Sequence, residues 1–329
     1  MDKPVDKSAA KPAAKPSVLA VAKLHPFYLQ ALEQNYTVHD RLHASDAEAF
    51  RKIAPSIVAI AASGESAVPG ELISQLPKLK VISVFGVGYD GVDVASAKMQ
   101  GVMVGHTPDV LSDDVADTAM ALVLAVARQI PIADKFVRAG LWPAGPLALG
   151  KKVTGARLGL VGMGRIASAI AKRASAFDMT ISYTARSRKA DLPYTYFPDA
   201  KTLAAEVDFL VAITPGGAAT KHLINAEVLQ ALGPKSYFIN VARGSVVDEA
   251  ALIEALRSGA IAGAGLDVFA NEPHVPEQLL TMPQVVLTPH MASATHETRQ
   301  AMADLAYANL HAGVGGLALR TPVPEMQAR

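Results

Sequence analysis

Three side chains that could handle a small organic acid lie in the last third of this 329-residue sequence. Arg243, Glu272 and His290 each come shortly after a short apolar run. If those runs are neighbouring parallel strands, their carboxyl ends share one rim and the three side chains meet there. Reduction of a 2-keto acid by hydride needs a cation for the carboxylate and carbonyl, a proton donor, and a group that keeps the donor protonated. A lone histidine or glutamate in such a place is more often structural and the arginine alone is ambiguous, so only their joint placement indicates a catalytic site.

A glycine-rich turn in the middle of the chain has the pattern of a dinucleotide-binding site. It directly follows the apolar run 158–161 and opens a segment with a helical pattern. Gly162 permits a tight turn, Gly164 lets a pyrophosphate approach the backbone, and Ala167 lets the helix lie close to the strand. The helix N-terminus offers unpaired N–H groups to the phosphates. The predicted contacts are Gly162, Met163, Gly164, Arg165 and Ile166; the alternative is a turn that serves packing alone.

The choice between the two nicotinamide dinucleotides is predicted from the end of the second strand. Enzymes that use NAD(H) place an acid there, on the ribose hydroxyl. Here the strand 180–184 is followed by a basic segment, Ala185-Arg186-Ser187-Arg188-Lys189, and the next carboxylate is Asp191. Guanidinium groups match the oxygens of a 2′-phosphate, which a carboxylate would repel. We therefore expect NADP(H) as the preferred cofactor, with NAD(H) as the second option and with Arg186, Ser187 and Arg188 as contacts; the alternative is a solvated basic turn.

The pattern of apolar runs and helical segments indicates two α/β domains with doubly wound parallel sheets. The predicted strands are 18–22, 57–60, 79–84, 157–161, 180–184, 209–213, 236–240, 263–268 and 285–288, and the predicted helices are 26–34, 70–76, 113–129, 165–176 and 249–258. The helix 113–129 is rich in Ala, Leu and Val, which is typical of a buried or interface helix. No low-complexity linker separates the two regions, so we expect helical crossings near residues 110 and 295.

Composition restricts the class of protein. The chain is long enough for two domains, and 50% apolar with 19% charged residues is typical of a globular protein. Zero cysteines exclude thiol catalysis and thiolate metal sites, and a net charge of +1 gives no field for nucleic acid or anionic lipid. Residues 1–16, rich in Lys, Pro and Ala, are predicted to be a disordered tail. No apolar run reaches membrane-spanning length and no signal peptide is evident, so we expect a cytoplasmic protein without a membrane or nucleic-acid partner.

Four motifs in chain order resemble those of the D-isomer-specific 2-hydroxyacid dehydrogenases. They are Gly162–Ala167, Val241-Ala242-Arg243-Gly244, Gly265-Leu266-Asp267-Val268-Phe269 followed by Asn271-Glu272-Pro273, and Thr288-Pro289-His290. The resemblance runs over nearly the whole chain after residue 16, and four ordered motifs make it specific. Within the family the chain is most similar to NADPH-dependent glyoxylate/hydroxypyruvate and hydroxyphenylpyruvate reductases, whose basic segment matches 186–188.

The resemblance implies a role for each catalytic residue. Arg243 would bind the substrate carboxylate and carbonyl, His290 would be the general acid/base, and Glu272 would hydrogen-bond the imidazole. An adjacent carboxylate favours the protonated imidazolium. Asp267 matches the family residue that faces the nicotinamide amide. Further cofactor contacts are expected at Thr214, Val241 and Ala242.

The resemblance also implies where the substrate binds. In the segment 85–90, the backbone N–H groups of Val87 and Gly88 match the loop that receives the carboxylate, and Ser293 is expected to line the pocket. Many members have glycine two residues after the histidine, where this chain has Ala292. The added methyl group lies near the nicotinamide and could trim the pocket without loss of function.

The family fold implies a discontinuous arrangement of domains. Residues 17–110 and 295–329 would form the substrate domain, and the NAD(P)-binding domain, 111–294, would be inserted between them. A homodimer would form through the helix 113–129 and the arm after it. Trp142, the single tryptophan, aligns with a residue that closes the neighbouring subunit's site; the alternative is that it packs the arm.

The expected activity is therefore NADPH-dependent reduction of glyoxylate, hydroxypyruvate or a similar 2-oxo acid, and the sequence leaves the size of the substrate open. Two other enzymes fit the sequence less well. A phosphoglycerate-dehydrogenase-like NAD enzyme usually has the acidic ribose contact, and formate dehydrogenase lacks the Glu–His pair. A nicotinamide-sensing binding protein on the same scaffold stays open as an alternative from a different functional class.

Overall fold

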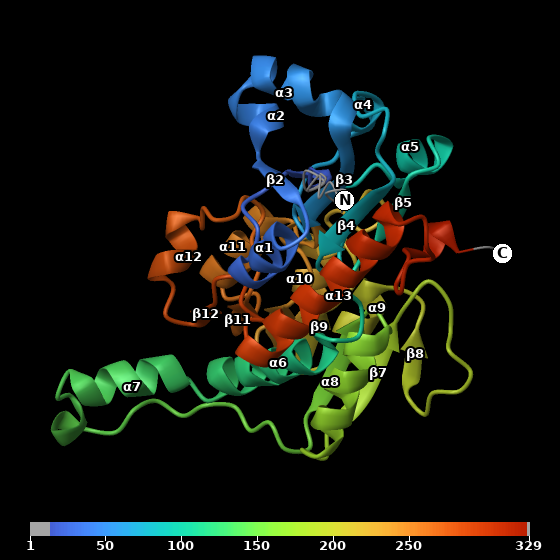
Figure 1. Cartoon of the computed structure of the whole chain (residues 1–329). Helices are drawn as coiled ribbons and strands as arrows, with labels where there is room; N and C mark the ends of the chain where they lie inside the picture. The colour runs from blue at the N-terminus through green and yellow to red at the C-terminus, as the bar shows by residue number, and fades with distance from the viewer. Residues whose placement is uncertain (1–13, 328–329) are drawn as a thin grey trace, which may run out of the picture. The chain divides into compact units, whose positions relative to one another are not determined.

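The structure is a computed structural model that describes residues 14–327 (Figure 1). The predicted tail, 1–16, falls mostly outside the described residues. The chain divides into two compact units. The first contains the described residues up to Thr107 together with those from Gln300 onward, and the second is the single stretch Pro108–Arg299. The first unit is therefore built from two separate stretches of chain.

The first unit contains a five-stranded sheet in which every strand runs parallel to its neighbours. The spatial order is β2-β1-β3-β4-β5, the flavodoxin-like order of a doubly wound sheet. The strands are β1 (Ser17–Ala20), β2 (Thr37–Asp40), β3 (Ile57–Ser63), β4 (Val81–Phe85) and β5 (Met103–Gly105). β4 is buried along its whole length, as expected for a central parallel strand covered on both faces.

The helices of the first unit are α1 (Pro26–Glu33), α2 (Leu42–Ser45), α3 (Ala47–Ile53), α4 (Gly70–Ser74), α5 (Val94–Met99) and most of α13 (His296–Val314), with 3₁₀ turns η1 (Ala54–Ser56) and η4 (Pro324–Met326). Side-chain caps fix several starts: Asp46 accepts from two backbone N–H groups of α3, and Asp93 accepts from the Ser96 N–H of α5. α13 joins the sheet through Ser83, a fully buried residue of β4 that donates to the Ala306 carbonyl at 2.8 Å. The C-terminal stretch is thus an integral part of this unit.

The second unit contains a seven-stranded parallel sheet in the order β12-β11-β10-β9-β6-β7-β8. Its strands are β6 (Arg157–Val161), β7 (Thr180–Thr184), β8 (Thr195–Phe197), β9 (Phe209–Ala212), β10 (Tyr237–Asn240), β11 (Gly263–Leu266) and β12 (Val285–Leu287). The order reverses between β6 and β9, which is the point where a dinucleotide binds in sheets of this type.

The helices of the second unit are α6 (Ser112–Ala127), α7 (Ile130–Arg138), α8 (Arg165–Ser175), α9 (Ala200–Ala204), α10 (Ala226–Leu232), α11 (Glu249–Arg257) and α12 (Glu277–Thr281), with 3₁₀ turns η2 (Trp142–Ala144) and η3 (Gly244–Val246). Residues of α9, α10 and α11 share one buried core with the strands. α6 packs against α8, β10 and β11. A Cβ on Gly265 of β11 would lie 3.0 Å from the Leu122 Cβ, so the glycine permits this close approach. The helix predicted to be buried is buried on most of its turns.

The predicted fold class is confirmed: the structure has two α/β units with parallel sheets. All nine predicted strands are present, and their bounds differ by at most a few residues from those of the structure. Three strands were missed. β2 and β8 contain no buried residue and lack the apolar run that identifies a strand, and β5 has only three residues.

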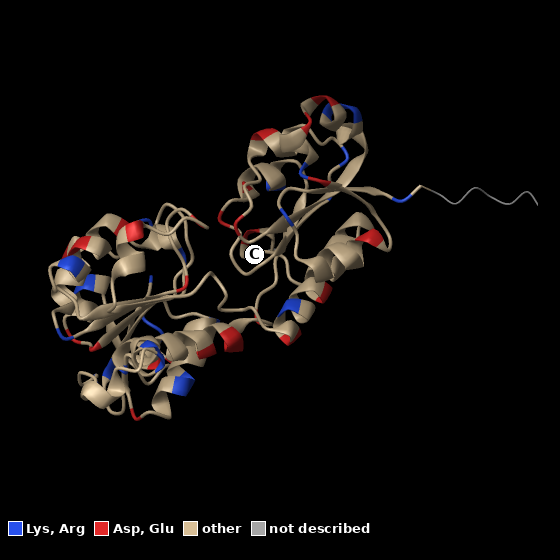
Figure 2. Cartoon of the chain, turned by 90° about the vertical axis from the view of Figure 1, so that its left-hand side faces the viewer, with Lys and Arg blue, Asp and Glu red and all other residues tan. Residues whose placement is uncertain are grey.

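Charges of both signs are spread over the helices of each unit (Figure 2). Within the described residues, no single helix has the length and apolar character to cross a membrane; α6 and α7 meet that test only as a pair bent by 58°.

Asp208 forms hydrogen bonds and ion pairs at the amino edge of the second sheet. It precedes β9, and its carboxylate accepts from the Arg157 backbone N–H at 2.9 Å and pairs with Lys151 at 2.9 Å and with the Arg157 Nε at 3.2 Å. Burial by itself would raise the pKa of this carboxyl, but the hydrogen bonds and cations outweigh burial and lower it from 3.8 to about 2. The charged form therefore stabilises the folded chain.

Replacing this carboxylate, as Asp208→Asn, is expected to lower the free energy of unfolding by about 2 kcal/mol at neutral pH. Because the folded pKa is depressed, this stabilisation is present above pH 3.8 and is lost as the pH falls toward about 2. The difference between parent and variant in urea unfolding should therefore be smaller at pH 3 than at pH 7. The matched control is Asp134→Asn, whose ion pair with Arg138 is exposed and contributes at most about 0.5 kcal/mol. Equal losses for the two variants would refute the role of Asp208.

Candidate active site

The three predicted catalytic residues follow neighbouring strands at one edge of the seven-stranded sheet. Arg243 comes after β10, Glu272 after β11 and His290 after β12, and these strands lie side by side in the order β12-β11-β10. Because the strands are parallel, their carboxyl ends lie on the same edge. The topology thus delivers all three residues to one rim.

Glu272 and His290 form a direct pair. The His290 Nδ1 lies 2.7 Å from the Glu272 Oε2, and both side chains are mostly buried, with exposed fractions of 31% and 21% for His290 and Glu272. The other carboxylate oxygen of Glu272 accepts the backbone N–H of Phe269 at 2.9 Å. A carboxylate oxygen accepts, so the Nδ1 carries the hydrogen, and the Nε2 is the imidazole atom that can exchange a proton with a substrate. Glu272 therefore fixes the tautomer and direction of the ring.

Asp267 organises the loop that carries the histidine. This residue is buried, and its Oδ1 accepts from the Thr288 hydroxyl at 2.7 Å and the Met291 N–H at 2.9 Å. Its Oδ2 accepts from the Ala292 N–H at 3.0 Å, and its carbonyl accepts from the His290 N–H at 2.8 Å. These bonds hold His290 at a φ of 47°, in the left-handed region. Its contact with the nicotinamide stays a prediction, since its carboxylate accepts hydrogen bonds from the 288–292 loop.

The backbone around Arg243 is held by Asn240, the last residue of β10. The Asn240 amide accepts from the Ala242 N–H and donates to the Arg243 carbonyl, each at 3.1 Å. The arginine itself donates from Nη1 to the Ala242 carbonyl at 2.8 Å. A Cβ on Gly244 would lie only 1.9 Å from the Phe269 carbonyl oxygen, so only glycine lets this turn reach the loop that carries Glu272.

The glycine-rich turn has the geometry of a phosphate site. Gly162 adopts a φ of 107°, and a Cβ there would lie 2.6 Å from the Ile213 carbonyl oxygen. At Gly164 a Cβ would meet nothing within 4 Å, so the protein does not fill that space. Gly164 is also the N-cap of α8 and provides no side-chain cap, which leaves the first N–H groups of α8 for a ligand. The residues present therefore fit a dinucleotide pyrophosphate.

The other residues predicted for the cofactor lie around this turn. Arg165 begins α8 and pairs with Asp109 at 2.9 Å, Ile166 follows it, and Met163 is buried. Thr214 lies two residues after β9, and its Cα would be 3.2 Å from a Cβ on Gly162. Val241 and Ala242 come directly after β10, and both are buried. β6 and β9 are adjacent parallel strands, so the glycine-rich turn after β6 and Thr214 after β9 lie side by side.

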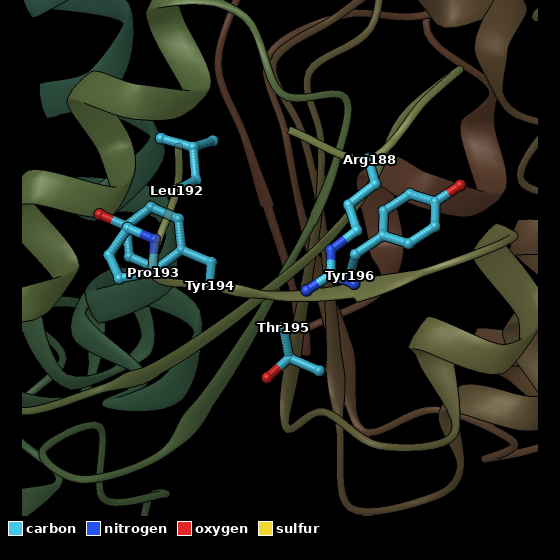
Figure 3. A pocket seen from close by; sticks show the side chains of 6 residues that line it. All are labelled: Arg188, Leu192, Pro193, Tyr194, Thr195 and Tyr196. Atoms are coloured by element: carbon cyan, nitrogen blue, oxygen red, sulfur yellow. The ribbon is translucent and has the colours of Figure 1, made fainter. Parts of the chain in front are cut away.

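Arg186, Ser187 and Arg188 follow β7 and are exposed. Within the described residues, neither guanidinium is paired with a carboxylate. Arg188 lines a cavity of about 440 Å³ with the stretch from Leu192 to Tyr196 (Figure 3). Figure 3 shows its side chain beside the ring of Tyr196. The two arginines therefore have different surroundings, which the sequence did not indicate.

The predicted substrate residues belong to different parts of the chain. Val87 and Gly88 follow β4 in the first unit, at the carboxyl edge of its sheet. In the second unit, Ser293 is half-buried after the histidine loop, and Trp142, in η2, is 67% exposed. Asn240 and His106 were missed; for Asn240, an available signal was its position as a polar residue at the end of a buried apolar run.

Comparisons with known proteins place this geometry in a family. A family model described as D-isomer specific 2-hydroxyacid dehydrogenase, NAD binding domain, matches residues 120–292. The chain is 49% identical over 270 residues to the hydroxyphenylpyruvate reductase of Plectranthus scutellarioides, covering 82% of this chain and 86% of that protein. It is 43% identical over 310 residues to the 2-ketogluconate reductase of Gluconobacter oxydans, covering 94% of this chain and 99% of that protein.

A solved structure with the same fold is that of the NADPH-dependent glyoxylate/hydroxypyruvate reductase of Sinorhizobium meliloti in complex with NADP and malonate. The TM-score is 0.90 at 44% sequence identity, and the match covers 96% of this chain and 99% of that one. The family model spans the glycine-rich turn and all three residues of the catalytic rim. The chain therefore belongs to the D-isomer-specific 2-hydroxyacid dehydrogenases, enzymes that use a nicotinamide cofactor.

Proposed function

We propose that this enzyme reduces glyoxylate, hydroxypyruvate or a related 2-oxo acid to the 2-hydroxy acid, of D configuration where C2 is a stereocentre, with NADPH as the preferred cofactor. The observation that carries the proposal is the pair of His290 and Glu272, 2.7 Å apart, on the same sheet edge as Arg243. Those three groups meet the needs of carbonyl reduction next to a carboxylate.

Each residue has a defined task in this reaction. The Arg243 guanidinium binds the carboxylate and polarises the carbonyl of the substrate. A bound NADPH supplies the hydride that C2 receives. The proton for the carbonyl oxygen comes from the His290 Nε2, because the Nδ1–H is engaged with Glu272. The two transfers convert the 2-oxo acid to a 2-hydroxy acid and leave a neutral imidazole, which takes a proton from solvent for the next cycle.

The preference for NADPH rests on the segment after β7. Arg186 and Arg188 are exposed cations without a carboxylate partner among the described residues, at the place where a ribose 2′-phosphate lies in sheets of this order. A 2′-phosphate carries nearly two negative charges, which guanidinium groups stabilise. The related S. meliloti reductase is described as NADPH-dependent, which supports the same preference here.

The open space at Gly164 leads to a test of the phosphate site. Gly164→Ala adds a methyl group that meets no protein atom, at a residue whose φ of −103° any side chain allows. The melting temperature should therefore change by less than about 2 °C, while the Kd for NADPH in a calorimetric titration should rise about tenfold or more through contact with the pyrophosphate. The matched variant Gly162→Ala should lower both stability and affinity, because its Cβ meets the protein backbone. Unchanged NADPH affinity in Gly164→Ala would show that the space does not hold the phosphates.

A second copy of this chain is the proposed protein partner. Large apolar side chains are exposed along one stretch of the second unit: Ile130, Val137, Leu141, Trp142 and Leu149, with exposed fractions of 49–96%. Apolar side chains gathered in this way are typical of an interaction surface. α7 and the segment after it are accordingly proposed to form a homodimer interface, with Trp142 directed to the partner's substrate site. Positive and negative side chains are mixed in both units, so we propose no nucleic-acid partner.

The proposed function is tested by steady-state oxidation of NADPH and NADH with glyoxylate, hydroxypyruvate and an aromatic pyruvate. We expect turnover with at least one of them and a higher kcat/KM with NADPH. The order of the three acids gives the size of the substrate pocket. Absence of turnover with all three, together with tight cofactor binding, would instead support a nicotinamide-sensing protein.

A further inference from the structure

A histidine outside the catalytic rim holds the loop predicted to receive the substrate carboxylate. His106 follows β5 and is 9% exposed. Its Nδ1 lies 2.9 Å from the carbonyl oxygen of Val87, and since a carbonyl only accepts, the Nδ1 carries the hydrogen. We propose that His106 is a positioning residue that orients the backbone N–H of Gly88 toward the carboxylate of the 2-oxo acid.

The orientation follows from the planarity of the peptide bond. In a trans peptide the C=O and the following N–H point in opposite directions. With the Val87 carbonyl bonded to His106, the Gly88 N–H must point away from the imidazole. A rotated peptide would present the carbonyl oxygen instead, and that oxygen would repel a carboxylate. The imidazole hydrogen bond therefore decides which end of the peptide faces the anion.

The preceding peptide, between Gly86 and Val87, has the same orientation. The carbonyl of Gly86 accepts the backbone N–H of Thr107 at 2.8 Å, so the N–H of Val87 also points away from the 106–107 segment. Two successive N–H groups on one side of a turn form a concave site for an anion. One of the two bonds is donated by the backbone and needs no particular side chain, whereas the other depends on the side chain of His106. The site is thus sensitive to substitution at one position.

His106 is itself held on three sides. Its carbonyl accepts from the Thr321 hydroxyl at 2.6 Å and from the Asn309 amide at 3.1 Å. The ring of Tyr89 meets the imidazole edge to face, with centroids 5.3 Å apart, and the Tyr89 hydroxyl donates to Glu325. The backbone of His106 and the ring packed against its imidazole are therefore both held by α13 and by the C-terminal residues after it. Such preorganisation is what an anion site built from backbone N–H groups needs.

The test uses two variants that separate the hydrogen bond from packing. His106→Phe keeps an aromatic ring against Tyr89 and removes the donor, whereas in His106→Asn the amide nitrogen takes the place of the Nδ1. Because the carboxylate is bound alike in substrate and transition state, His106→Phe should raise the KM for glyoxylate about tenfold or more with kcat within about threefold. His106→Asn should restore the KM to within about threefold of the parent. His311→Asn, at a histidine of α13 bonded to Tyr36, is the control and should leave the KM unchanged.

The inference rests on the proposed function, so a second readout is independent of turnover. Calorimetric titration of the NADPH-loaded enzyme with oxalate should show weaker binding for His106→Phe than for the parent, with unchanged NADPH affinity. A parent enzyme that binds oxalate but reduces no 2-oxo acid would refute the function and leave the anion site standing.

Three results would overturn the role of His106. They are an active parent with an unchanged KM in His106→Phe, an equal rise of the KM in the Phe and Asn variants, and absence of oxalate binding by the parent. If the Phe variant fails to fold, His106→Gln replaces it. The amide of glutamine lies one bond farther from the backbone than that of asparagine and does not match the position of the Nδ1. The Gln variant should then have a higher KM than the Asn variant, and equal values would contradict the proposal.

Discussion

His290→Gln is expected to lower kcat for glyoxylate reduction by about a thousandfold, because the variant has no group that can donate a proton to the carbonyl oxygen. Binding of NADPH should be unchanged, since the histidine lies after β12 and the glycine-rich turn lies after β6. The measurement is steady-state turnover with saturating NADPH, together with the Kd for NADPH from calorimetry. A glutamine keeps most of the volume of the imidazole, which limits the structural disturbance.

Two further variants make that result specific. Glu272→Gln should lower kcat by about ten- to a hundredfold, because a neutral amide neither fixes the tautomer nor favours the imidazolium. His274→Gln is the matched control: this exposed histidine is only two residues from Glu272 and should have the turnover of the parent. If His290→Gln retained turnover within about fivefold of the parent, another group would have to supply the proton.

Arg186→Asp is expected to lower kcat/KM for NADPH about a hundredfold, while kcat/KM for NADH is unchanged or higher. The substitution removes a cation and places a carboxylate where the 2′-phosphate would bind. The same carboxylate can accept the ribose 2′-hydroxyl of NADH, as the acid at this position does in NAD-dependent enzymes of this fold. Initial rates with both cofactors at saturating glyoxylate measure the change.

Arg186 and Arg188 have different surroundings, so we expect their substitution to have different effects. Arg188 lines the cavity beside Tyr196, so Arg188→Asp should have a smaller effect on NADPH than Arg186→Asp. Arg320→Asp, an exposed arginine of the first unit, controls for the change in net charge. Equal losses with NADPH and NADH in Arg186→Asp would mean that the residue supports the fold of the turn and not the phosphate.

Much of the second unit could be predicted from sequence because its strands are buried on both faces. Runs such as 158–161 and 209–212 consist almost entirely of apolar residues, and a charged residue precedes each of them. The glycine-rich turn was found for the same reason, since its glycines follow a buried strand. The edges were harder: β8, at the end of the sheet, has only three residues and no buried one.

The site was predicted in outline, but its contacts were not. The order of the strands can be inferred from the motifs, yet the bond between His290 and Glu272 depends on two loops whose paths no sequence pattern specifies. The bonds of Asp267 to the 288–292 loop were likewise invisible, because they join residues more than twenty positions apart. His106 has no motif of its own, and its role follows only from the carbonyl that it faces.

Transfer of hydride to C2 of a 2-oxo acid is the reaction proposed for this chain. Its most direct test is to incubate the enzyme with hydroxypyruvate and NADPH deuterated at both C4 positions of the nicotinamide, and to analyse the glycerate by mass spectrometry and chiral chromatography. We expect D-glycerate with one deuterium, located at C2, formed in step with oxidation of NADPH. Glycerate without deuterium at C2, or bound NADPH without reduction of hydroxypyruvate, glyoxylate or an aromatic pyruvate, would contradict this transfer.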